Sequence, residues 1–196
     1  MPGTHSFGEV SYTLTDLLVA RYDFTAGTYG TPVALADGQM LKIEHEADND
    51  QLRGYGQKTR LLTVTVGAKI TLGQGGVDMA AMVIIAGVST ATSGTAPNRV
   101  RSVDFPAGGA GLPYWGVIGV ATTDDGGYAV VGLQACKLNS QPVFTLDGNE
   151  NKFNLSETEG YAVPVNSKLT RIKFYETAST FTAPTSGANF LAHFTG

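Results

Sequence analysis

The sequence has little charge for its length. Charged residues make up 15% of its 196 residues, whereas an ordinary soluble domain has about 25%. Lys and Arg number 13 against 17 Asp and Glu, which gives a net charge of -4. Too few cations are present to neutralise phosphates, so a basic nucleic-acid-binding protein is excluded. The composition also excludes a charge-rich disordered chain and a coiled coil.

Cysteine and long apolar segments are scarce as well. Cys136 is the single cysteine, which excludes an intramolecular disulfide and a metal site built on paired thiolates. We expect this thiol to be buried as a small apolar group. The longest apolar run, Val77 to Val88, is interrupted by Asp78 and is too short to span a bilayer. Residues 1–10 show no signal-peptide pattern, so we expect assembly in a reducing cytoplasm without membrane contact.

Glycine, threonine and period-two alternation dominate what is present. The chain has 25 Gly and 23 Thr among its 196 residues, and 42% of the residues are apolar, a composition typical of a β-rich protein. Leu61 to Leu72 alternates apolar and polar residues throughout, and Met40 to Glu46 behaves similarly. With residues 47–58 as a polar loop between them, these segments predict a long hairpin.

The remaining chain predicts further strands and a single helix. A helix is expected over Val77 to Ala86, with Asp78 as its N-cap and Gly87 at its end. Val88 to Asn98 is rich in Ser, Thr, Ala and Gly and is predicted to be a loop. The other strands are expected at Leu17 to Phe24, Arg99 to Phe105, Tyr114 to Ala121, Tyr128 to Leu138, Gly160 to Val165 and Thr170 to Thr177.

Both ends of the chain lack periodicity but contain aromatic residues. We therefore divide the chain into an N-terminal arm region (1–30), a central β domain (31–178) and a C-terminal arm (179–196). Solvated tails would not need this many Phe residues. Two interpretations stay open: the ends pack on their own domain, or they dock on neighbouring subunits.

A search for reactive residues predicts no catalytic site, no metal site and no cofactor. His5, His45 and His193 form no metal-binding or triad spacing, and His45 is expected to be a satisfied core or interface residue. The segment Gly73 to Gly76 lacks the glycine and lysine pattern of a phosphate loop. A glycosidase-type carboxylate pair is neither favoured nor excluded. The residue inventory therefore indicates a structural or binding protein that is not an enzyme.

The order of these segments resembles a known family. A long hairpin is followed by Gly75-Gly76-Val77-Asp78 and a short apolar helix. Next come Tyr114-Trp115-Gly116-Val117-Ile118-Gly119, an Asp-Gly turn and the strand Tyr128 to Leu138. A strand pair, Glu157 to Val163 and Arg171 to Tyr175, follows. This order, over 34–177, resembles the major tail proteins, or tail tube proteins, of long-tailed (siphovirus-type) bacteriophages.

The resemblance implies both a fold and a function. It implies a mainly β fold, a β-sandwich or half-barrel with one short flanking helix, which assembles into a ring with a continuous inner β-barrel. Six copies would form each ring, and stacked rings would form a conduit for genome ejection. The expected partners are further copies of the chain, other tail proteins and double-stranded DNA as transient, non-specific cargo. The expected location is the virion tail, assembled in the host bacterial cytoplasm.

The resemblance also suggests which residues carry the function. The polar face of the long hairpin offers Glu44, Glu46, Thr63 and Thr65 as lumen-lining residues. Lys42 and Lys69 lie on the same strands, so they would have to be paired or sited elsewhere if DNA is to slide past. Contacts between subunits and rings are expected from Asp48, Asp50, Arg53, Tyr55, Phe7, Phe190 and Phe194.

Other functions remain open at this point. A virion decoration or adhesin-type β-sandwich would be expected to trimerise. A tail-completion protein of the same fold would form one ring without polymerising. A β-rich hydrolase would need a carboxylate pair or a histidine-based site among residues such as His45, Glu44 and Glu46.

Overall fold

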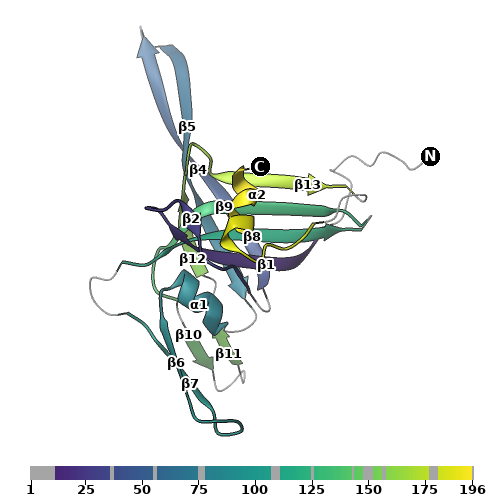
Figure 1. Cartoon of the computed structure of the whole chain (residues 1–196). Helices are drawn as coiled ribbons and strands as arrows, with labels where there is room; N and C mark the ends of the chain where they lie inside the picture. The colour runs from purple at the N-terminus through teal and green to yellow at the C-terminus, as the bar shows by residue number, and fades with distance from the viewer. Residues whose placement is uncertain are drawn as a thin grey trace, which may run out of the picture.

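The protein is mainly β, with antiparallel strand pairing and two short helices in the part that the computed structural model describes (Figure 1). This confirms the mainly β prediction. The described residues are 12–35, 38–54, 57–74, 78–106, 111–124, 126–142, 144–147, 152–155, 158–176 and 181–195.

Most strands join one sheet. Within the described residues it has nine strands, in the order β2-β1-β8-β9-β12-β5-β4, with β13 also paired to β9 and β3 to β1. Two separate hairpins, β6–β7 and β10–β11, complete the strands. The sheet strands are β1 (Tyr12–Asp23), β2 (Thr28–Tyr29), β3 (Val33–Ala34), β4 (Gly38–Gly54), β5 (Gln57–Gln74), β8 (Tyr114–Thr123), β9 (Tyr128–Leu138), β12 (Thr158–Val163) and β13 (Thr170–Tyr175). The hairpin strands are β6 (Ser89–Ser93), β7 (Val100–Asp104), β10 (Phe144–Asp147) and β11 (Lys152–Leu155).

The sheet folds back so that β4, at one end of the order, packs on β8. A Cβ atom on Gly119 would lie 2.6 Å from Leu41 Cδ2, so glycine is needed where the two strands meet. This contact forms part of the wall of an apolar hollow of about 510 Å³, which is lined by residues from β1, β4, β8, β9 and β13 that include Leu14, Ile43 and Ile172.

Each face of the sheet carries one helix. On the first, the α1 face, helix α1 (Met79–Ile85) covers a core that includes Ile70, Trp115 and Leu133. On the second, the α2 face, helix α2 (Gly187–Thr195) covers a cluster that includes Tyr29 and Ile118. Successive strand residues alternate between the faces, so both faces of the central strands are apolar.

Helix α1 confirms the predicted helix and its cap. The Asp78 carboxylate accepts hydrogen bonds from the backbone N–H of Ala80 at 2.8 Å and Ala81 at 3.2 Å, which satisfies donors that the first turn leaves free. At the other end Gly87 has φ of 68°, in the left-handed region that favours glycine after a helix.

Helix α2 was not predicted, and it settles how the C-terminal segment packs. Phe190 and Phe194 are 0% and 1% exposed within their own chain, so their prediction as inter-subunit contacts is wrong. Room for the helix comes from Gly132, where a Cβ would lie 2.7 Å from the Phe194 ring. At its C-terminus, Lys173 Nζ and Arg171 Nη1 each approach a carbonyl of the last turn, those of Ala192 and Phe194, at 3.5 Å.

Three further predictions need correction. The hairpin of Met40 to Glu46 with Leu61 to Leu72 is confirmed, but the predicted loop over 47–58 is wrong, because strand pairing continues to Gly54 and Gln57. The predicted loop Val88 to Asn98 contains β6, paired with β7. Residues 12–29, assigned to an arm, supply β1 and β2 inside the sheet.

Cys136 is fully buried, as predicted, and burial raises the pKa of its thiol well above the usual range. Among the helices that the structure describes, none combines the length and apolar character needed to cross a membrane.

Candidate functional site

A row of side chains crosses six strands on the α2 face. Each member is the direct cross-strand partner of the next, from β1 through β8, β9, β12 and β5 to β4. Directly opposed residues share one face of a sheet and lie close enough to interact. The row consists of Tyr22, Tyr114, Lys137, Tyr161, Lys69 and Glu44.

Beyond α2, the residues of this row and their neighbours on the same face are polar, and we call this surface the charged face. It is carried by β4, β5, β9 and β12, and Tyr161 is 41% exposed. Its members are Lys42, Glu44, Glu46, Lys69, Lys137, Glu159 and Tyr161.

Carboxylates pair with two of the lysines on the charged face. Lys69 Nζ lies 2.8 Å from Glu159 Oε1, and Lys42 Nζ lies 3.0 Å from Glu44 Oε1. The hydrogen bond that Lys69 donates to the Glu159 carboxylate raises the pKa of Lys69, so the ammonium stays charged and paired. From the sequence, Lys42 and Lys69 had to be either paired with carboxylates or sited away from the DNA path. Both lysines are paired.

The third lysine of this face contacts an aromatic ring. Lys137 Nζ lies 4.9 Å from the centroid of the Tyr114 ring, within the range of a cation–π contact. From β8 to β5 the row therefore alternates tyrosine and lysine, and it ends on β4 at the carboxylate of Glu44.

The four predicted lumen residues do not share one face. Glu44 and Glu46 are exposed on the charged face, where they lie opposite Lys69 and Gly67 in the β4–β5 register. The register then shifts, so that Thr65 pairs with Ala47 and Thr63 with Asn49. Because the extra residue of this bulge is on β5, β4 keeps its alternation and the threonines lie on the opposite face. Thr63 Oγ1 donates to Asn49 Oδ1 at 2.7 Å there, so assigning both threonines to the same wall as the glutamates is wrong.

The predicted contact residues fall into three groups. The first group lies on β4 and consists of Asp48, Asp50 and Arg53, opposite Val64, Leu62 and Lys58 of β5. Of these, Asp48 is exposed. Phe7 and Tyr55 lie outside the described residues. As stated above, Phe190 and Phe194 are buried in their own chain.

Beyond Gly67 the β4–β5 hairpin becomes a two-stranded distal ribbon, formed by residues 47–54 and 57–66. Pairing with β12 ends at Ala68, so within the described strands each ribbon strand has a neighbour on one side only. Val64 and Val66 are 50% and 51% exposed. Figure 1 shows the ribbon projecting from one side of the molecule and the β6–β7 hairpin from the opposite side.

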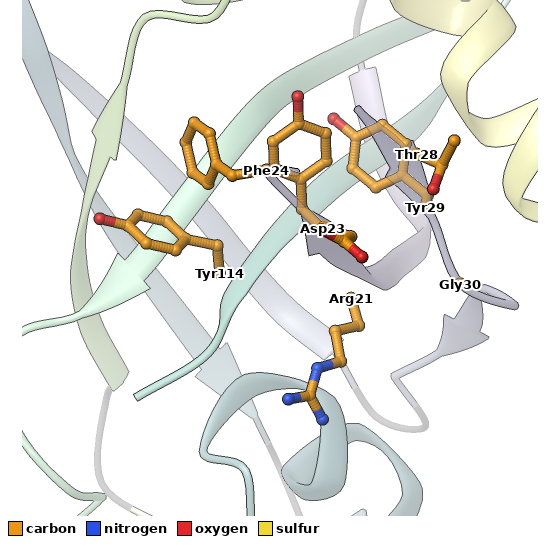
Figure 2. Close-up of a pocket in the computed structure, with 8 residues that line it drawn as sticks. Arg21, Asp23, Phe24, Thr28, Tyr29, Gly30 and Tyr114 are labelled. Carbon is orange, nitrogen blue, oxygen red and sulfur yellow. The ribbon is translucent and has the colours of Figure 1, made fainter. Parts of the chain in front are cut away.

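A cleft of about 700 Å³ lies at the other end of the sheet (Figure 2). Its aromatic wall includes Phe24, in edge contact with Tyr114. Arg21 points away from these rings (Figure 2), because alternation along β1 places it on the other face. Tyr29 donates its hydroxyl to the Gln134 carbonyl at 2.7 Å, and burial raises the pKa of that phenol. The polar groups of this cleft therefore do not converge on one ligand position.

The described histidines have structural contacts. His45 lies on the face of Leu41 and Ile43 by alternation, and its Nε2 is 2.8 Å from Thr170 Oγ1 at an exposed position. His193 is buried beside Phe194, and burial lowers its pKa to about 4. In the part of the chain that the structure describes, no three His, Cys, Asp or Glu residues gather as a metal site would require.

One element that the sequence interpretation missed did carry a signal. Ser186 Oγ accepts the backbone N–H of Asn189 at 3.3 Å, as an N-cap does. Phe190 and Phe194 are spaced by four residues, so they share one helix face. The segment starting at Pro184 could therefore have been recognised as a short helix.

No protein-family model and no curated protein sequence matches the chain.

Proposed function

We propose that this protein is a structural subunit that self-assembles into stacked hexameric rings forming a bacteriophage tail tube, through which the genome is ejected. For the fold of the single subunit, the proposal is a half-barrel. The sheet that folds back over the apolar hollow supports it, because closing such an edge against the next subunit would give a continuous inner barrel.

The observation that carries the proposal is the distal ribbon. A two-stranded ribbon without a core is at best marginally stable in water, and long open edges promote association between chains. This one also exposes Val64 and Val66. A neighbouring copy that covers the ribbon would remove both liabilities, and a ring does so for every subunit.

The charged face is the surface that suits a lumen. The α1 face is covered by α1 and is apolar, whereas Glu44, Glu46 and Tyr161 face solvent on the other side. A conduit for DNA must be hydrated and must not bind phosphates tightly. The balanced charges of this face, with Lys42 and Lys69 paired, support that role.

The test is negative-stain electron microscopy of the purified protein over a range of concentrations. We expect rings or tubes for the native chain. Val64→Lys should prevent their formation, because it replaces a half-exposed apolar side chain of the distal ribbon by a cation, while the unfolding temperature stays close to native. The matched control is Ser140→Lys, which adds the same charge at an exposed turn and should leave assembly intact.

The same images and a solution mass separate the alternatives. A strictly monomeric species at high concentration would contradict the proposal. A trimer would favour a decoration or adhesin-type module instead, and single rings that never stack would favour a tail-completion protein.

A further inference from the structure

The charges of the charged face are balanced in number, and two of its lysines are also matched in position to a glutamate. Its described charged side chains are three lysines (Lys42, Lys69 and Lys137) and three glutamates (Glu44, Glu46 and Glu159). Two of the lysines are within 3.0 Å of a carboxylate oxygen. Even the cations at the far edge of the α2 face, Arg171 and Lys173, approach helix carbonyls.

Stability does not explain these pairs. In the Lys69–Glu159 pair the side chains are 33% and 48% exposed, and in the Lys42–Glu44 pair 55% and 50%. Ion pairs this exposed contribute little to folding, because water and salt screen them.

Without the glutamates, this surface would have the composition of a nucleic-acid-binding face. Aromatic rings interleaved with cations are how proteins hold single-stranded nucleic acid without sequence preference, and cations alone suffice to bind the phosphates of a duplex. Here Tyr161 lies between Lys69 and Lys137 in the cross-strand row. Since adjacent strands are about 4.8 Å apart, the two lysines are roughly 10 Å apart across the sheet.

We propose that Glu159 and Glu44 act as built-in counter-ions that keep Lys69 and Lys42 from binding the phosphates of duplex DNA. This inference rests on the proposed function, because it assigns the charged face to contact with DNA in transit. Each carboxylate occupies its ammonium, so no small counter-ion is released when a phosphate passes. Counter-ion release is the main source of non-specific DNA affinity, and the surface stays wet and non-adhesive.

The experiment measures binding of a fluorescein-labelled 30-base-pair duplex to the full chain by fluorescence anisotropy, from low to high NaCl. The native protein should bind the duplex only weakly, with an affinity that can be measured at the lowest salt. Glu159→Gln breaks the ion pair of Lys69, and each phosphate contact that this lysine then gains should raise affinity roughly eightfold at about 0.1 M salt and steepen the salt dependence by about 0.9. Assembled rings should amplify the gain, because several copies act on one duplex.

Two control variants make the result specific. Glu176→Gln removes one exposed carboxylate outside the charged face and should leave DNA binding unchanged. The double variant Lys69→Gln/Glu159→Gln should return binding to the native level. Equal binding by Glu159→Gln and Glu176→Gln would overturn the inference, as would strong salt-dependent binding by the native protein.

The outcome is separable from that of the proposed function. Tubes formed by a native protein whose Glu159→Gln variant gains no DNA affinity would refute the counter-ion role alone. Monomers in every condition would refute the tube, whatever the anisotropy shows.

Discussion

Strand β5 crosses two environments that differ although their sequence pattern is the same. In the body of the protein, Ala68, Ile70 and Leu72 are at most 1% exposed. In the distal ribbon, a few residues earlier on the same strand, Val64 and Val66 are half exposed. Alternation of apolar and polar residues predicts that one face of a strand is buried. It does not indicate whether that face is buried by the same chain or by another copy. The ribbon is where we place the second copy.

The largest effect is expected in the body. Phe190→Ala should lower the free energy of unfolding by about 3–5 kcal/mol, because it empties a fully buried site under α2. Urea unfolding followed by the fluorescence of the single tryptophan, Trp115, measures it. Phe24→Ala is the control, since that ring is 48% exposed and should cost much less. Equal losses would mean that α2 is not part of the body.

The next largest effect is a dependence of the free energy of unfolding on pH. The pKa of His193 is lowered to about 4 from 6.5, mainly by burial and also by Lys173 and Arg171. The unfolded chain therefore binds more protons between these values, so stability is complete above pH 6.5 and falls as pH drops toward 4. The loss is on the order of 3 kcal/mol. It is measured by urea unfolding at several pH values.

A neutral replacement provides the control for the pH effect. His193→Gln should flatten the dependence between pH 4 and 6.5, even if it lowers stability throughout. A native profile that is already flat over that range would show that His193 is not buried as a neutral group.

The smallest effect on folding is expected in the ribbon. Val66→Ala should change the free energy of unfolding by no more than about 0.5 kcal/mol, whereas Ile70→Ala on the same strand should cost about 2–5 kcal/mol. Urea unfolding of dilute monomer measures both. A large loss for Val66→Ala in the monomer would mean that the chain itself covers the ribbon, and the contrast between the two regions would disappear.

The sequence was informative where a strand or helix has a core to face. The hairpin, α1 with its Asp78 cap and β9 could be predicted, because burial imposes periodicity there. The distal half of β4, with Asp48, Asn49 and Asp50, was interpreted as a loop because successive polar residues interrupt the alternation there. Strand β6 was missed because all five of its residues are exposed, so burial imposes no periodicity on it.

The candidate site could be predicted only in part. Glu44 and Glu46 were identified from their alternation with the apolar residues of β4. The bulge beside Val66, which turns Thr63 and Thr65 to the other face, depends on register and has no signal in the strand sequence. Glu159, the partner of Lys69, lies far along the chain, and only the pairing of β12 with β5 brings them together.

The start of helix α2 ties the two ends of the described chain together. A Cβ atom on Gly187 would collide with the Tyr29 carbonyl of β2, so the last helix sits directly on one of the first strands. Contacts this distant in sequence close a long loop, which costs conformational entropy and slows folding. During synthesis, the surface around Tyr29 and Ile118 therefore stays uncovered until α2 has left the ribosome, so this face can be completed only after all of its strands have been synthesised.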